Sequence, residues 1–144
     1  MSDSKVTKEE LDKLVDLAIK SKDYAHVPYS NFRVGAALMG VDGKIYTGCN
    51  VENASYGLTI CAERTAYTKA VSEGTKEYKA IVVTTDVIDR FITPCGACRQ
   101  FGIEFGDFEV YCVKPDKTIF KTSSSQLLPG SFTIKDLEAQ SAQK

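Results

Sequence analysis

The sequence predicts an α/β fold in which one mixed five-stranded sheet is flanked by helices. Segments with strand character alternate with segments of helical periodicity through the middle of the chain, which is the pattern of α/β layers. Two strands joined by a short turn indicate an antiparallel hairpin within that sheet. The 144 residues suit one compact unit without an internal repeat or a linker, so we expect a single domain over residues 1–144.

The first third of the chain predicts one helix followed by the hairpin. Thr7 to Glu10 has the pattern of a capping box, and apolar residues then recur at helical spacing, which predicts a helix over residues 8–22. Alternating side chains from Phe32 to Met39 indicate a strand. Asp42-Gly43 is typical of a tight turn, which leads into a second strand over residues 44–49.

The later elements are predicted from capping residues and short apolar runs. Thr93 followed by Pro94 has the pattern of an N-cap and a first helical position. A serine-rich stretch before Leu127 is expected to be a bend. The elements that we expect after the hairpin are a helix over 61–71, a strand over 79–85, a helix over 94–105, strands over 108–113 and 118–121, and a short helix over 134–139.

Composition and charge exclude several classes of protein. The 18 basic and 19 acidic side chains give a net charge of -1, without the block of Lys or Arg that polymeric nucleic acid requires. The apolar stretches are shorter than the roughly 20 residues that cross a bilayer, and the N-terminus lacks the apolar region of a signal peptide. We therefore expect no polymeric nucleic acid and no membrane as partner, and a protein of the cytosol, or of the cytosol and the nucleus.

Three of the five cysteines have the spacing of metal ligands. Cys95 and Cys98 lie three positions apart at the start of a predicted helix, where they share one face, and Cys61 begins another helix. Helix N-termini lower the pKa of thiols and so favour the thiolates that bind metal. Three thiolates around zinc leave one position open, which is typical of a catalytic site. Glu63, two residues after Cys61, is then the candidate general acid and base.

One positive side chain completes this hypothesis, and three other residues of metal-binding types are left out of it. Arg64 follows Glu63, and we expect its guanidinium to hydrogen-bond the thiolates and so to offset the negative charge of the cluster. We assign no function to Cys49 or Cys112, which fall in predicted strands, or to His26, which falls in a loop.

Two interpretations without hydrolytic chemistry remain open at this point. Cys95 and Cys98 could form a thiol-disulfide redox pair, which would need neither Cys61 nor Glu63 and would bind no metal. A structural zinc site is the second alternative, with Cys49, Cys112 or His26 as the fourth ligand. Against both stands the joint presence of a Glu near the first ligand and a Pro-Cys-x-x-Cys segment, which is the pattern of zinc-dependent nucleobase deaminases.

Several blocks of the sequence together resemble the small homotetrameric cytidine deaminases of pyrimidine salvage. Relatives that act on cytidylate or on polynucleotides have His in place of Cys61, so the thiol favours a free nucleoside as substrate. The tail differs from the family's usual pattern, because Thr133-Ile134 stands where Gly-Pro is common. The blocks that carry the resemblance are Tyr29 to Ala37, Gly48 to Gly57, Thr59 to Arg64, and Thr93 to Gln100.

The resemblance implies roles for residues that contact the substrate. Asn50 and Glu52 are similar to the pair that holds the ribose hydroxyls. Phe32 resembles the aromatic residue beside the pyrimidine. The backbone N–H of Ala62 would bind the carbonyl of the base, and the backbone carbonyl of Thr93 would accept a hydrogen bond from the departing amine.

The resemblance also implies an assembly and a reaction. Tyr56 and Phe132 resemble residues that reach into a neighbouring subunit's site, so a homotetramer with shared active sites is expected. The implied reaction is zinc-dependent hydrolysis of cytidine and 2′-deoxycytidine to uridine and 2′-deoxyuridine, with release of ammonia. A deaminase for another aminated heterocycle is the alternative among enzymes, and its substrate would not depend on Asn50 and Glu52.

Overall fold

The computed structural model describes residues 5–142 and contains the mixed five-stranded sheet that the sequence predicts. The strands are β1 Val34–Gly40, β2 Ile45–Cys49, β3 Tyr78–Thr85, β4 Glu109–Val113 and β5 Ile119–Ser123. Their order across the sheet is β2-β1-β3-β4-β5. The predicted fold class is therefore confirmed, and the bounds of each strand lie close to the predicted ones.

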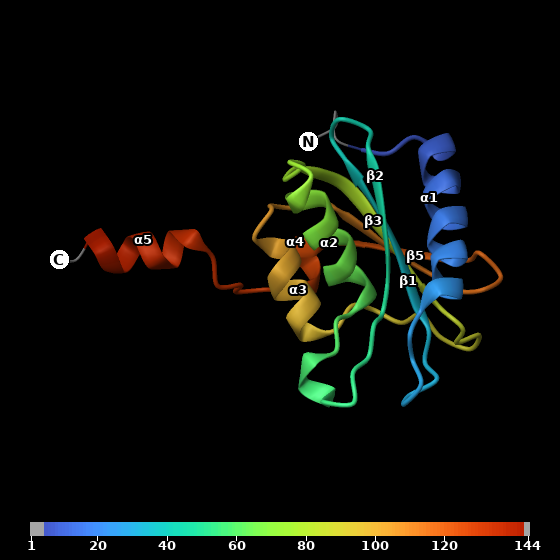
Figure 1. Cartoon of the computed structure of the whole chain (residues 1–144). Coiled ribbons are helices and arrows are strands. Elements are labelled where there is room, and N and C mark those ends of the chain that lie inside the picture. The colour runs from blue at the N-terminus through green and yellow to red at the C-terminus, as the bar shows by residue number, and fades with distance from the viewer. Residues whose placement is uncertain (1–4, 143–144) are drawn as a thin grey trace.

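Helices lie on both faces of the sheet. The helices are α1 Lys8–Ser21, α2 Ala62–Ser72, α3 Gly96–Ile103, α4 Ser124–Leu127 and α5 Ile134–Ala142, with 3-10 turns η2 Lys22–Tyr24 and η3 Tyr56–Leu58. Figure 1 shows α1 on one face, α2, α3 and α4 on the other, and α5 leading away from the body. In the described part of the chain, no helix is both long and apolar enough to span a membrane.

Each face of the sheet has its own apolar core. Under α1, Leu14 and Ala18 are fully buried against the alternate residues of β1, β3 and β4 that point to that side, such as Val82. Under α2, small side chains face the sheet, and an alanine every fourth residue lets the helix approach closely. The alanines of this stripe, all fully buried, are Ala62, Ala66 and Ala70.

The direction of strand pairing brings two helix starts together. β1 pairs antiparallel with β2 and β3, and β4 pairs antiparallel with β5. β3 and β4 are parallel, with Val82 opposite Tyr111, so a crossover that contains α3 must join them. α2 precedes β3 and runs against it, so the start of α2 lies near the end of β3, where the crossover leaves the sheet.

Helix bounds depart from the predictions in three places. The N-cap of α3 is Cys95, in extended conformation with ψ of 167°, so the prediction of Thr93 as N-cap is wrong. The Thr93 hydroxyl instead accepts a hydrogen bond from Arg99 Nη2 at 2.9 Å. The serine-rich stretch is not only a bend, because it contains α4, capped by the Ser123 side chain. Finally, α5 runs to Ala142, beyond the predicted end at residue 139.

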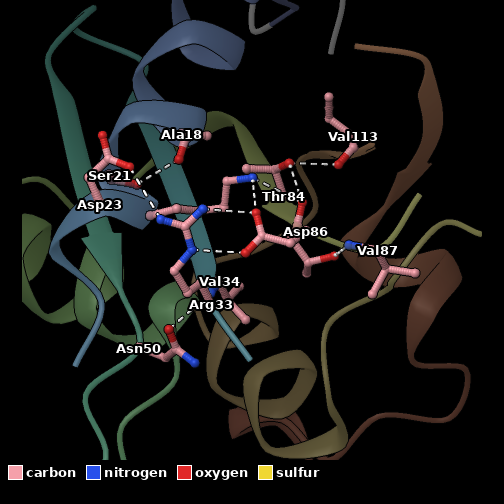
Figure 2. A network of polar contacts seen from close by, with 12 residues as sticks. Ala18, Ser21, Asp23, Arg33, Val34, Asn50, Thr84, Asp86, Val87 and Val113 are labelled. Atoms are coloured by element: carbon pink, nitrogen blue, oxygen red, sulfur yellow. Dashed lines mark hydrogen bonds and ion pairs between the residues drawn. The ribbon is translucent and has the colours of Figure 1, made fainter. Parts of the chain in front are cut away.

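An ion-pair network ties the end of β3 to the segments that precede β1 (Figure 2). Asp86 receives two hydrogen bonds from Arg33, from Nε at 2.8 Å and Nη2 at 3.0 Å. Lys22 Nζ donates to Asp86 Oδ1 at 2.9 Å and to the carbonyl of Thr85 at 3.1 Å, although the Lys22 side chain is buried. Arg33 Nη1 also contacts Asp23 at 3.3 Å. The network fixes the chain that enters β1, which carries residues of the candidate site.

Candidate metal centre and active site

Three sulfur atoms meet where α2 and α3 begin. Cys61, Cys95 and Cys98 form the one group of three potential metal ligands found among residues 5–142, with all Sγ atoms within 4.8 Å of one another. The Sγ of Cys61 is 3.8 Å from that of Cys95, and the Sγ of Cys95 is 3.5 Å from that of Cys98. The starts of the two cysteine-bearing helices therefore lie together, as a metal site shared by Cys61, Cys95 and Cys98 requires.

The sulfur geometry fits zinc. Zinc–sulfur bonds of about 2.3 Å in tetrahedral arrangement place two sulfurs about 3.8 Å apart. The Cys61–Cys95 and Cys95–Cys98 separations lie at or close to that value, so a zinc ion would need little movement of these side chains. His26, Cys49 and Cys112 lie outside this group, so within the described residues no fourth protein ligand closes the site. That arrangement favours an open, catalytic position over a structural zinc site.

Helix ends hold two of the thiols in a positive field. Cys61 is the N-cap of α2 and Cys95 is the N-cap of α3, and neither side chain is used to cap its helix. Both residues have extended backbones, the usual conformation of an N-cap. Cys98 lies in the first turn of α3 and is buried. Two helix N-termini therefore point at one cluster, which stabilises negative charge on sulfur.

Hydrogen bonds distribute the charge within the cluster. Hydrogen bonding from Cys98 and then the Arg64 guanidinium lower the pKa of Cys61 to about 5. The pKa of Cys98 is raised, first because it shares that hydrogen bond with Cys61 and then because it is buried. Arg64 Nη2 donates to Cys61 Sγ at 3.2 Å. Ligands must be ionised to bind metal, so a divalent cation would replace the proton that Cys98 retains.

Glu63 lies beside the sulfurs in a cavity. Its side chain is only 5% exposed, and burial is the main cause that raises its pKa to about 7. A carboxyl group with such a pKa can both accept and donate a proton near neutral pH. The cavity has a volume of about 190 Å³. Its lining includes Phe32, Asn50, Thr59, Cys61, Glu63, Thr93 and Cys95.

Four other residues expected at the site do not line this cavity with their side chains. The side chain of Ala62 is fully buried under α2, and its backbone N–H belongs to the first turn of that helix. Glu52 and Tyr56 line an adjacent hollow of about 220 Å³, which shares Thr59 with the cavity. Phe132 is 57% exposed, precedes α5 and does not line the cavity of its own chain.

Two residues that support the site were not assigned a role from the sequence. Arg99 Nε donates to the carbonyl of Pro94 at 2.6 Å, and Arg99 Nη1 donates to that of Leu127 at 2.9 Å. Arg99 therefore fixes the segment that carries Cys95 against α4. Thr59 lies between the cavity and the adjacent hollow. The position of Arg99 directly after Cys98 could have indicated its role from the sequence. Nothing in the sequence around Thr59 indicates a comparable role.

The fold and this site define a class of protein. A three-sulfur cluster at two helix starts, a buried glutamate beside it and a crossover α/β sheet form the arrangement of zinc-dependent deaminases. The family described as "Cytidine and deoxycytidylate deaminase zinc-binding region" matches residues 8–114.

Individual proteins show the same similarity. A "Probable cytidine deaminase" of Dictyostelium discoideum is 67% identical over 138 residues, which is 96% of this chain and 94% of that protein. A cytidine deaminase of Sporosarcina psychrophila is 47% identical, over 89% of this chain and 95% of that protein. The crystal structure of cytidine deaminase from Burkholderia pseudomallei superposes with a TM-score of 0.82 at 44% identity, covering 88% of this chain and 100% of that one. The chain belongs to the cytidine and deoxycytidylate deaminase family, whose cofactor is zinc.

Proposed function

We propose that the chain catalyses the hydrolytic deamination of cytidine and 2′-deoxycytidine to uridine and 2′-deoxyuridine, with release of ammonia. The observation that carries this proposal is the buried carboxyl group of Glu63 in the same cavity as the ligand sulfurs. Relatives named cytidine deaminase align over nearly the whole chain, which supports the same substrate class. A thiol-disulfide function would not require a buried glutamate at this place.

The proposed mechanism assigns the metal to three ligands and the proton transfers to one side chain. Cys61, Cys95 and Cys98 would hold zinc, which supplies Lewis acidity and brings the pKa of a water molecule towards neutrality. Glu63 takes a proton from the water that attacks C4 of the pyrimidine and delivers it to N3. The same carboxyl group then takes the remaining proton from the hydroxyl group on C4 and transfers it to the amine, which leaves as ammonia when the C4–N bond breaks and the C4 carbonyl forms. Arg64 donates a hydrogen bond to Cys61 Sγ and so offsets the negative charge of the sulfurs, which would otherwise reduce the Lewis acidity of the metal.

The nucleoside would be held by groups that line or adjoin the cavity. Phe32 lies beside the base, and Asn50 and Glu52 bind the sugar hydroxyls. The N–H of Ala62 is one of the free donors of the first helical turn and binds the carbonyl of the base. The carbonyl of Thr93 accepts a hydrogen bond from the amine that leaves. The placement of Phe32, Asn50 and Thr93 in one cavity with Glu63 supports these assignments.

We also propose that the active form is a homotetramer in which subunits complete each other's sites. Tyr56 is 72% exposed and Phe132 is 57% exposed, so both side chains are accessible to a neighbouring subunit. Phe132 lies outside the cavity of its own chain, so it would have to act on another subunit. A mass measurement in solution tests this assembly, and a monomer with full activity would contradict it.

Thiolate ligands must remain reduced, so we place the reaction in the cytosol, where it would serve pyrimidine salvage. This part of the proposal rests on the chemistry of the ligands.

The experiment that tests the function compares the protein with its Glu63→Gln variant. Uridine formed from cytidine and zinc bound per chain are measured for both proteins. We expect kcat to fall about 10²- to 10⁴-fold in the variant, the usual contribution of a general acid and base, while zinc is retained. Glu73→Gln, an exposed substitution at the far end of α2, is the matched control and should leave both values unchanged.

The outcomes separate the alternatives. Zinc without uridine formation in the unchanged protein would favour a metal-stabilised binding protein. Absence of zinc with reversible oxidation of Cys95 and Cys98 would favour a redox protein. Undiminished turnover in Glu63→Gln would refute the assigned mechanism. For a substrate without a sugar, Glu52→Gln should leave KM unchanged, whereas the proposal expects KM for cytidine to rise.

A further inference from the structure

The loop before β1 is bound to the residues that follow β2. The N–H of His26 donates to the carbonyl of Asn50 at 3.0 Å, and the N–H of Glu52 donates to the carbonyl of His26 at 2.8 Å. From this point the chain leaves the strand-like pairing, forms a loop over residues 27–33 and returns to the sheet as β1. The loop therefore begins beside Asn50 and Glu52, which the proposed function assigns to the sugar.

The side chains of Asn50 and Glu52 hold the far part of the same loop. Asn50 Nδ2 donates to the carbonyl of Phe32 at 2.7 Å, and Asn50 Oδ1 accepts from the N–H of Val34 at 2.9 Å. Glu52 Oε1 accepts from the N–H groups of Tyr29 and Ser30, each at 3.1 Å. Thus the two side chains that would bind the sugar also fix the backbone on either side of Phe32.

One hydroxyl group connects these two halves. Ser30 Oγ donates to Glu52 Oε2 and accepts a hydrogen bond from the N–H of Phe32 at 3.0 Å. Asn31, between Ser30 and Phe32, has a φ of 56°, in the left-handed region that asparagine adopts more readily than most residues other than glycine. Ser30 Oγ makes two contacts around this turn from a single atom, one with Glu52 and one with the N–H of Phe32.

We propose that Ser30 is a positioning residue that sets Glu52 for the sugar and Phe32 for the base of the nucleoside. This inference rests on the proposed function. Ser30 lines the hollow beside the cavity and does not line the cavity itself, so it acts through its neighbours. The hydrogen bond from Ser30 is the largest cause that lowers the pKa of Glu52, which keeps that carboxylate ionised and oriented as an acceptor.

The chemistry of the loop indicates which kinetic constant should change. Without the hydroxyl, Glu52 and the N–H of Phe32 each lose a partner, and the loop samples conformations in which neither side chain is placed for the nucleoside. Loss of preorganisation weakens binding of substrate and transition state alike. Such a loss raises KM and leaves kcat nearly unchanged. We expect KM for cytidine to rise about tenfold, because one hydrogen bond to a charged group is involved.

The experiment compares Ser30→Ala with Ser30→Thr, which retains the hydroxyl. Steady-state kinetics with cytidine give KM and kcat, and calorimetric titration with uridine gives a Kd that does not depend on turnover. We expect the Ala variant to raise KM and Kd about tenfold and to change kcat less than about threefold, and the Thr variant to restore most of the loss. Ser72→Ala, an exposed serine at the end of α2, is the control.

A double substitution separates positioning from general stability. In a Glu52→Ala background, Ser30→Ala should raise Kd for uridine by clearly less than the tenfold expected in the unchanged protein, because the contact with Glu52 is already absent and only the contact with the N–H of Phe32 remains to be lost. Additive effects, an unchanged KM in Ser30→Ala, or failure of Ser30→Thr to restore affinity would each overturn the inference. If the unchanged protein formed no uridine from cytidine, the proposed function would fail instead, and that result is visible before any variant is measured.

Discussion

Gly48→Ala provides a test of how the packing of α2 on the sheet sets the geometry of the site. Gly48 lies in β2 directly under the start of α2. A Cβ atom at this position would lie 2.3 Å from the carbonyl oxygen of Ala62 and 2.8 Å from the N of Ala66. Both are backbone atoms, so no side chain can rotate away. To reach an ordinary contact of 3.4 Å, α2 must move by roughly 1 Å, the difference from 2.3 Å.

That movement has two separate consequences. Overpacking of this kind costs about 1–3 kcal/mol of folding free energy, which corresponds to a melting temperature lower by about 5 °C. Glu63 and Cys61 move with the helix, and a displacement of about 1 Å costs on the order of 10²-fold in kcat/KM. Differential scanning calorimetry and cytidine kinetics measure the two effects.

The matched control for this test is Gly57→Ala. An added Cβ there would have no atom within 4 Å, and the backbone of Gly57 has an ordinary negative φ. If Gly48→Ala retained both the melting temperature and kcat/KM of the unchanged protein, the argument that β2 sets the position of α2 would be wrong.

Two further substitutions address the charges of the structure. The Arg33 guanidinium holds the pKa of Asp86 at about 2, against an ordinary value of 3.8, so Asp86 stabilises the fold above pH 3.8, and this contribution is lost as the pH falls through about 2. We expect Asp86→Asn to lower the free energy of unfolding, measured in urea at pH 7, by about 1 kcal/mol, a value reduced because the pair is partly exposed to solvent. The difference in stability between the two proteins should shrink below pH 4. A difference that does not depend on pH would contradict the assignment. Arg64→Gln should lower kcat for cytidine about ten- to a hundredfold with zinc retained, as shown by metal analysis, and unaltered turnover would exclude its role beside Cys61.

Local patterns in the sequence predicted most of the fold. The capping box of α1 is present, with the Thr7 side chain accepting from the N–H of Glu10 and the Glu10 side chain accepting from the N–H of Thr7. Like the capping box, the period-two alternation and the Asp42-Gly43 turn depend only on residues that are near in sequence, so they predicted the hairpin correctly. The N-cap of α3 was misplaced because the Thr93 hydroxyl accepts a hydrogen bond from the side chain of Arg99, within α3, and does not cap the backbone of the first turn.

The candidate site was predictable to the extent that chemistry fixed its residue types. Soft ligands at Cys-x-x-Cys spacing and a glutamate near a third cysteine indicate metal-assisted hydrolysis whatever the surrounding fold. The hydrogen bonds that join Ser30 to Glu52 are different, because they connect residues 22 positions apart in irregular backbone. No periodicity or turn preference in the sequence indicates such a contact, so it can be identified only from the structure.

The parallel pairing of β3 with β4 has a consequence for the order in which the protein acquires its metal. Val82 and Tyr111 meet only after the whole crossover has been synthesised, and non-local pairing of this kind forms slowly. Cys61 precedes the first of these strands, and Cys98 lies inside the crossover. The pairing of β3 with β4 fixes both ends of the segment that carries Cys95 and Cys98, and so keeps the start of α3 beside Cys61. We therefore expect zinc to be held tightly only by a chain in which this pairing has formed.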